Sequence, residues 1–393
     1  MALRTERKAG ERQMEKIKQF LKKELMLTVS VLAAIISFFI TPPSAELFSY
    51  IDWRTLGILF MMLTILEGFK QESIFRPLLL LAGKLHSMAA LSLFLVFSVF
   101  FSSMFVTNDI SLIIFVPLTI ILFRAGDKEK YILPVITMEN IAAIRGSLLT
   151  PFGSPQNLFI FGKSGVSAIE FVLYMLPICL VSGVLLICFV LFLYRKDIKE
   201  QTSITGSGHA GEWDKKKKGV RIAYLIIFAV VLATIVSRTG YWMFVAIAVV
   251  IAVLIIDRKL LIKTDYVLLL TFLSFFIFSS SVAHNQKIAD FLSSAVSGSE
   301  YIWSILLSQI ISNVPAGIVL YPFAVNKGAL IYGLDSAGLC TLIGSLASVI
   351  NYRIYVREYP ENGKKFIKVF TLISLLFFAF VAVPGYFISL RPL

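Results

Sequence analysis

The fold is decided by residues 88–123, which read MAALSLFLVFSVFFSSMFVTNDISLIIFVPLTIILF and contain one charged residue, Asp109. As a single α-helix these ~36 residues would be ~54 Å long, whereas the hydrocarbon core of a bilayer is ~30 Å thick. The chain therefore has to reverse direction inside this stretch, and the polar sequence Thr107-Asn108-Asp109 is where we expect the turn. Length alone allows two full spans or a re-entrant hairpin, and both return the chain to the side from which it came.

A second apolar stretch, residues 301–323, breaks at Ser312-Asn313-Val314-Pro315. Its arms of about 11 and 9 residues would reach only ~16 Å, roughly half of a bilayer. This stretch is therefore predicted to form a re-entrant helical hairpin whose tip lies near the midplane of the membrane.

Two further apolar segments, residues 130–162 and 329–354, contain the pattern Thr-x-x-Gly-Ser, at residues 150–154 and 341–345. Glycine and proline interrupt regular helix, so each segment is predicted to be a helix that is broken within the membrane. Irregular backbone is tolerated at membrane depth only where it is buried in protein or lines a polar cavity. The breaks are therefore expected to line a binding site.

Composition places most of the chain in a membrane. Its 393 residues are 58% apolar and 16% charged, whereas soluble domains are about 45–50% apolar and about 25% charged. We therefore expect an all-α polytopic membrane protein with about nine transmembrane helices, two re-entrant helical hairpins and two broken helices. Outside the hairpins, the predicted spans are residues 25–41, 53–70, 130–162, 168–194, 221–237, 241–256, 264–283, 329–354 and 366–389.

The distribution of the net charge of +13 indicates the topology, because cytoplasmic loops of membrane proteins are enriched in Lys and Arg. With the N-terminus inside, 30 of the 37 basic residues fall in cytoplasmic segments, and Arg145 lies within the membrane. This split predicts a cytoplasmic N-terminus, an external C-terminus and a location in the plasma or inner membrane, and it requires no nucleic-acid partner. The basic residues on the external side are Arg54, Lys163, Arg238, Lys287, Lys327 and Arg391.

The chain also divides into two similar halves. In each half an apolar helix and a short amphipathic piece precede a hairpin, a broken helix and a long final span. Because one additional helix, residues 221–237, separates the halves, the second half enters the membrane from the opposite side, and the repeats are predicted to be inverted. The expected organisation is a cytoplasmic amphipathic N-terminal segment at 1–24, the first inverted repeat at 25–194, a basic cytoplasmic linker at 195–220, and the extra helix with the second repeat at 221–393.

The polar residues at the tips and breaks have a chemical use. Carbonyl groups freed by a broken helix, together with hydroxyl and amide oxygens, suit a hard cation such as Na⁺, and the N-terminal ends of half-helices direct positive dipoles at an anion. Small and hydroxyl residues that merely let helices pack are the alternative at any single break. Four breaks in two inverted pairs favour a binding site. Besides the hairpin tips, it would contain Thr150, Ser154, Asn157, Ser345 and Ser348.

Two charged residues, Asp109 and Arg145, lie within predicted membrane segments, where ionisable groups are costly and are commonly functional. Asp109 is a cation ligand or proton carrier, or else the N-cap of the second hairpin arm. Arg145 is a fixed cation that attracts an anionic substrate, or else an interhelical partner of Glu139 or Glu67, or a side chain that extends toward the cytoplasmic face.

Other chemistries find no support in the sequence. The three Cys and three His residues are scattered without the spacing of metal ligands. Motifs for nucleotide binding and for hydrolysis are missing, so we expect no enzyme activity and no cofactor other than Na⁺ or H⁺ as a coupling ion.

Three motifs resemble the ion transporter superfamily, most closely its arsenite-permease-like anion permeases and its divalent-anion/sodium symporter branch. The resemblance covers nearly the whole chain from about residue 25 and is carried by SSMFVTNDISLIIFVPL (102–118), GSLLTPFGSPQNLFIF (146–161) and SQIISNVPAGIVLYPF (308–323). It implies elevator-type movement of a transport domain against a scaffold, often within a homodimer. The carboxylate symporters carry Ser-Asn-Thr at both tips, whereas this chain has Thr-Asn-Asp and Ser-Asn-Val-Pro, and GSLASVIN (344–351) lacks the Thr-Pro…Pro-x-Asn pattern of the first break.

Residue by residue, the resemblance implies two cation sites and one substrate site between the tips. The implied cation ligands are Thr107, Asn108, Gly153 and Asn157 in the first half and Ser312, Asn313, Gly344 and Ser348 in the second. Thr150 is added to the expected cation ligands because its hydroxyl lies in the first break. The residues expected to contact substrate are Thr107, Asn108, Asp109, Arg145, Ser154, Ser312, Asn313 and Ser345.

The function expected from these features is secondary active transport of small anions, carboxylates or related oxyanions, coupled to a sodium or proton gradient. An arsenite or metalloid efflux permease is one alternative. A sodium/proton antiporter, in which Asp109 carries the proton, is another. A channel would not need inverted, paired hairpins, and is the least favoured of these.

Overall fold

The structure is a computed structural model that describes residues 24–42, 51–74, 81–82, 85, 87–196, 218–391 and 393. All regular secondary structure in these residues is helical. The prediction of an all-α protein is therefore confirmed. The predicted N-terminal segment 1–24, apart from its last residue, and most of the predicted linker 195–220 lie outside the described residues.

The first half contains two long helices, a hairpin, a broken helix and a closing helix. The long helices are α2 (Leu25–Ile40) and α4 (Trp53–Gln71), and the hairpin arms are α6 (Met88–Val106) and α7 (Asn108–Ala125). After the short helix η1 (Glu129–Tyr131), the broken helix consists of α8 (Ile132–Ser147) and α9 (Pro155–Ser164), and α10 (Ala168–Leu193) closes the half.

After one additional helix, α11 (Lys218–Ser237), the second half repeats this order, and its first long helix is α12 (Trp242–Asp257), which the short α13 (Lys259–Lys263) follows. It continues with α14 (Tyr266–His284) and the amphipathic α15 (Gln286–Val296). The hairpin arms are α16 (Glu300–Ile311) and α17 (Asn313–Leu320), followed by η3 (Tyr321–Phe323). The broken helix is α18 (Lys327–Ala337) and α19 (Leu346–Glu358), and η4 (Pro360–Asn362) leads into α20 (Gly363–Ser389).

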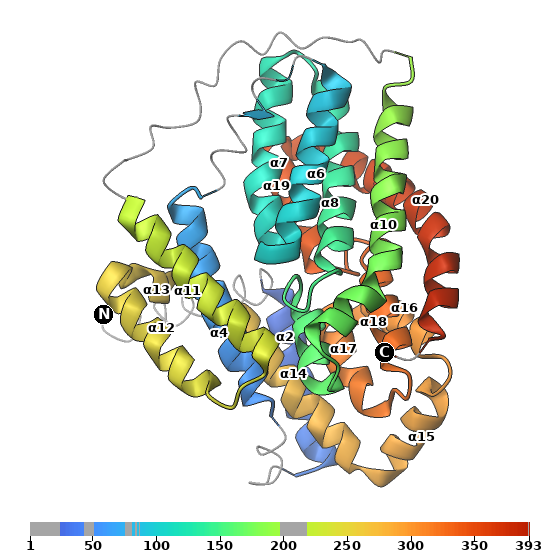
Figure 1. Ribbon diagram of the computed structural model, residues 1–393. Helices are drawn as coiled ribbons and strands as arrows, with labels where there is room; N and C mark the ends of the chain where they lie inside the picture. The colour runs from blue at the N-terminus through green and yellow to red at the C-terminus, as the bar shows by residue number, and fades with distance from the viewer. Residues whose placement is uncertain are drawn as a thin grey trace, which may run out of the picture.

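The two halves run in opposite directions. Figure 1 shows α6 and α7 in the upper part of the view and α15 to α17 in the lower part. The closing helices are antiparallel, because the Tyr174 hydroxyl in the second turn of α10 donates to the Arg391 carbonyl just beyond α20, at 2.8 Å. Each broken helix also has a glycine where it packs closely on its hairpin: a Cβ on Gly146 of α8 would overlap the Phe100 carbonyl of α6, and a Cβ on Gly333 of α18 would overlap the Tyr301 carbonyl of α16.

The helices form two groups. In the first, α4 packs against α11, α12 and α13, and α14 packs against α2. In the second, α8 packs against α6, α7, α10, α19 and α20, and α18 packs against α16 and α20. Figure 1 shows α4 with α11 to α13 on the left and α6, α8, α10 and α20 on the upper right. The groups meet where α14 contacts α17 and where α4 contacts α9 and α7.

Six helices of the described residues are long and apolar enough to cross a membrane, and α2, α12 and α16 are shorter apolar helices. The arms of the first hairpin have 19 and 18 residues, about 28 and 27 Å at 1.5 Å per residue, so each is long enough to span. The arms of the second have 12 and 8 residues, which agrees with the predicted short hairpin. The chain is thus a multi-pass membrane protein.

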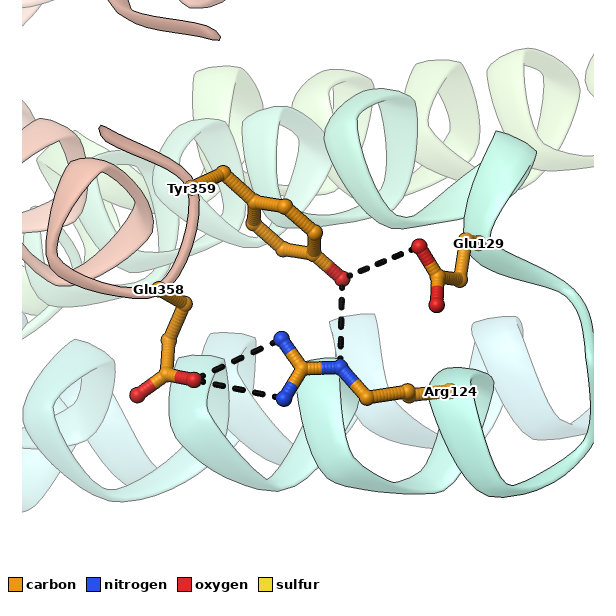
Figure 2. Close-up of polar contacts among 4 residues, drawn as sticks. All are labelled: Arg124, Glu129, Glu358 and Tyr359. Carbon is orange, nitrogen blue, oxygen red and sulfur yellow. Dashed lines mark hydrogen bonds and ion pairs between the residues drawn. The ribbon is translucent and has the colours of Figure 1, made fainter. Parts of the chain in front are cut away.

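A polar cluster joins the two halves at the end of the first hairpin that lies away from its tip. Figure 2 shows the Arg124 guanidinium at the end of α7 facing Glu358 at the end of α19, with an N–O distance of 3.3 Å. The Tyr359 hydroxyl accepts a hydrogen bond from Arg124 and donates one to Glu129, both at 3.4 Å. Both partners of the Arg124–Glu358 ion pair are more than 40% exposed, so it contributes little to stability.

Candidate functional site

Both hairpin tips hold a residue in the same rare backbone conformation. Thr107 has φ 72° and ψ 156°, and Ser312 has φ 70° and ψ 157°. This region is populated almost only by glycine, and a side chain there costs about 1–3 kcal/mol, which is seen mainly at functional sites. Neither hydroxyl makes a hydrogen bond with any described residue. The two tips therefore present strained residues with hydroxyls that the protein does not use.

The first tip lies against the first break, residues 148–154. The Thr150 hydroxyl donates to the Met104 carbonyl in the last turn of α6 and so joins the break to the hairpin. The Asn157 side-chain amide lies 3.4, 3.1 and 3.3 Å from the carbonyl oxygens of Ser147, Leu148 and Thr150. Asn157 is fully buried and its Oδ1 has no partner. The Asn157 amide thus gathers the carbonyls of the break, and its own Oδ1 is left as a free oxygen ligand.

The second tip lies against the second break, residues 338–345, in a similar way. The Asn313 backbone N–H donates to the Gly344 carbonyl at 3.2 Å. Ser348, at the position equivalent to Asn157, donates to the Gly338 carbonyl at 3.5 Å and accepts from the Asn140 amide at 3.0 Å. The Ser345 hydroxyl is buried without a partner.

Glycine is required in both breaks because the chain folds back onto the preceding half-helix. A Cβ on Gly153 would overlap the Ser147 carbonyl, and a Cβ on Gly344 would overlap the Ala337 carbonyl. The Thr-x-x-Gly-Ser pattern therefore encodes the same close approach twice, and the prediction that these segments are broken helices is confirmed.

A cavity of about 360 Å³ lies between the two helix groups, next to the first tip and the first break. The first residues of α9 and α19, and Thr107 just before α7, are in its wall, so three helix N-termini point their positive ends toward it. Its charged lining residues are Glu67, Lys70, Asp109, Lys263 and Asp265.

The predicted site residues fall into three groups. Thr107, Asp109 and Ser154 line the cavity. The buried residues behind it in the first half are Asn108, Thr150, Gly153 and Asn157. The second-half residues Ser312, Asn313, Gly344, Ser345 and Ser348 gather at the second tip and break, and none of them is in the cavity lining.

Asp109 does not cap the second hairpin arm. It lies inside the first turn of α7, and its Oδ1 is buried without a hydrogen-bond partner. The capping interpretation was therefore wrong, because the N-cap position of α7 is Thr107. The backbone N–H of Asp109 donates to the Asn108 side-chain oxygen at 2.9 Å. Its carboxylate faces the cavity together with Asp265 of the other helix group.

Arg145 lies outside the cavity lining, and the interpretation of it as a partner of Glu139 or Glu67 was wrong. It is 1% exposed, donates to the Ser182 hydroxyl at 2.9 Å and donates to the Asp335 carbonyl at 3.3 Å. Gln156 of α9 donates to the Asp335 carboxylate at 3.0 Å. This network ties both broken helices to α10, and full burial also excludes the alternative that Arg145 extends toward the cytoplasm.

Sequence reasoning missed Asp335 and Gln156. A usable signal was present, because Asp335 is the one acidic residue of the predicted span 329–354 and an ionisable residue at membrane depth is functional by default.

Glu139 is also fully buried. Its carboxylate accepts a hydrogen bond from the Thr119 hydroxyl, and its second oxygen has no partner. In the described residues no group of three or more His, Cys, Asp or Glu side chains is placed to hold a metal ion.

Two strained hairpin tips that lie against two broken helices, in an apolar helical chain with repeated halves, define a membrane transporter. The chain belongs to the citrate transporter family, whose pattern matches residues 14–331. The matched range contains both hairpins and the first broken helix, and it ends before the second break.

Known proteins of similar sequence and structure agree with this class. The chain is 31% identical over 330 residues to an uncharacterized transporter of Methanocaldococcus jannaschii, covering 84% of this chain and 87% of the other. It is 29% identical over 357 residues to the inner membrane protein YbiR of Escherichia coli, covering 89% and 91%. Among solved structures, the YdaH transporter of Alcanivorax borkumensis, described as having an unusual topology, is similar with a TM-score of 0.59 and 15% identity, covering 93% of this chain and 97% of that one. At this sequence identity, the similarity to the YdaH transporter supports the fold alone.

Proposed function

We propose that this protein is a secondary active transporter of small anions, with citrate and related carboxylates as the first candidates, coupled to a Na⁺ or H⁺ gradient. The observation that carries the proposal is the pair of tips, in which Thr107 and Ser312 share one strained conformation and each tip lies against a broken helix. Strain of this kind persists where the surrounding structure holds residues ready for a ligand.

The electrostatics of the cavity suit an anion and a cation together. Lys263 and the N-terminal ends of three helices favour an anion, whereas Lys70 is already paired with Glu67 at 3.3 Å. The carboxylates of Asp109 and Asp265, with the oxygens that surround Asn157, favour a small cation. An anion and its coupling cation bound side by side would neutralise each other, which lowers the cost of carrying either through hydrocarbon.

The place of the cavity supports an elevator-type mechanism. One wall is formed by α4 and α14 of the first helix group, and the other by α7, α9 and α19 of the second group. Movement of the second group along the first would carry a substrate held at the tips from one side to the other. With the predicted topology, Lys70 and Lys263 place this cavity on the cytoplasmic side of a plasma or inner membrane. A homodimer formed through the first helix group is part of the proposal.

Sodium/proton antiport is the second candidate, and a specific observation favours it. Asp109 has a buried oxygen without a partner and shares the cavity with Asp265. A carboxylate in that position is able to exchange a proton for Na⁺ without any organic substrate.

Transport into liposomes distinguishes these functions. The purified chain is reconstituted, Na⁺ and pH gradients are imposed separately, and uptake of labelled citrate, succinate and arsenite is followed. The proposal expects gradient-driven carboxylate uptake that Asn157→Ala abolishes and that Asn362→Ala, the same change outside the site, leaves intact. If a Na⁺ gradient moves protons without any anion, the antiporter is correct. Uptake of arsenite alone would indicate a metalloid permease.

A further inference from the structure

A second, smaller cavity lies at the other end of α9 and is surrounded by basic side chains. It has a volume of about 120 Å³, and its lining includes Arg54 at the start of α4 and Lys163 at the end of α9. Arg238, in the turn between α11 and α12, lies beside it and donates to the carbonyl of Phe161, which is in the lining, at 2.6 Å. These three residues belong to the external side in the predicted topology.

Positive charge is in excess around this cavity. Asp52 is its one acidic lining residue, and that carboxylate is already used by the Thr55 backbone and hydroxyl and by Lys163 at 3.4 Å. Arg54 makes no hydrogen bond or ion pair with any described residue, and its Nε is buried.

Arg238 adds to this excess. Its Nε is also buried without a partner, and Arg54 is close enough to act on it electrostatically. The acidic residue that acts on Arg238 is Glu170 of α10, whose carboxylate also accepts the Ser167 N–H in a capping box. Two guanidinium groups with unused donors thus border one cavity, Arg54 in its lining and Arg238 through the Phe161 carbonyl, and an anion there would neutralise them.

The small cavity and the central cavity share one wall. Leu158 of α9 is in the lining of both cavities. The neighbouring residues of α4 are divided between them, with Ile58 in the lining of the small cavity and Leu59 in the lining of the central one. Because α9 has 10 residues, its two ends are ~15 Å apart. An anion at the outer end would therefore be one half-helix away from the first break, separated from it by apolar side chains.

We propose that Arg54, Lys163 and Arg238 form an external capture site for a small oxyanion of the carboxylate type, and that Leu158 and Ile58 close the path between it and the central cavity. The inference rests on the proposed anion transport. A guanidinium group binds a carboxylate through two parallel hydrogen bonds, and the positive charge around the cavity would concentrate the anion before the tips bind it.

The test compares Arg54→Gln and Lys163→Gln with Lys287→Gln, which removes charge from an exposed lysine on the same predicted side. Labelled citrate uptake is measured in right-side-out vesicles at low salt. Each of the two site variants raises KM by roughly tenfold while kcat stays within about twofold, because the site increases the rate at which the anion binds and does not affect later steps. Lys287→Gln behaves like the wild type. Unchanged KM in Arg54→Gln overturns the proposal.

Direct binding separates this proposal from the transport function itself. Labelled citrate is dialysed against Asn157→Ala protein in nanodiscs of phosphatidylcholine, so that the central site is disabled. Saturable binding that is abolished by adding Arg54→Gln supports the capture site, even if the chain transports no citrate. Absence of binding, or binding that phosphatidylglycerol in the nanodisc competes away, assigns the cluster to structure or to lipid phosphate and overturns the proposal.

Discussion

Replacing Ser312 by glycine should stabilise the protein while it damages the site. At φ 70° and ψ 157° the serine side chain costs about 1–3 kcal/mol, and glycine removes that cost. Glycine also raises the conformational entropy of the unfolded chain, and this lowers the free energy of unfolding by about 0.4–1 kcal/mol. The Ser312 hydroxyl bonds to no described residue, and its backbone bonds to Ser308 and Ala316 stay in place. The net gain over Ser312→Ala, which keeps the strain, is therefore about 1.3 kcal/mol from the midpoints of these ranges.

The assay is reversible unfolding in mixed micelles, with Ser312→Ala as the matched control because both variants lack the hydroxyl. We expect the glycine variant to unfold at a higher denaturant fraction than the alanine variant, and transport to fall in both. Thr107→Gly against Thr107→Ala should repeat the result in the other half. Equal stability of the glycine and alanine variants would refute the reasoning, because it would mean that the tips hold no strain.

Three further changes test the packing around the site. Gly153→Ala should abolish folding or transport, because the new Cβ overlaps the Ser147 carbonyl. Gly183→Ala in α10 should be tolerated, because the atom nearest to the new Cβ is 3.8 Å away. Expression and thermal stability are measured for both variants. Asp335→Leu should cost about 3–5 kcal/mol, measured by unfolding, because it leaves Arg145 buried without its counter-charge. Glu358→Gln should cost less than about 1 kcal/mol, and less still in high salt, because the pair with Arg124 is exposed.

Residue patterns predicted the fold well where covalent geometry is decisive. The length of residues 88–123 required a turn, and the Thr-x-x-Gly-Ser pattern located both helix breaks. The arms of the first hairpin could not be assigned in this way, because full spans and half spans are equally apolar. In the structure each arm is long enough to cross, which agrees with the length argument from the sequence.

The sequence predicted the positions of the tips and breaks better than the contacts behind them. Tips and breaks are local features, and glycine and hydroxyl residues mark them in the sequence. The partner of Arg145 depends on how the two halves pack, and Asp335 lies 190 residues away along the chain. A charge pattern along the sequence does not contain that information. The two alternatives for Asp109 could not be separated for a related reason, since capping depends on a single residue of register at the tip.

The central claim is that two tips from opposite halves act on one substrate, and transport by tip variants tests it most directly. Initial rates of gradient-driven citrate uptake are measured in liposomes for Asn108→Ala, Asn313→Ala and the control Asn362→Ala, at equal amounts of folded protein. The account predicts that each tip variant loses at least about tenfold in rate, which corresponds to about 1.4 kcal/mol, while the control is unaffected. Full activity of either tip variant would contradict it.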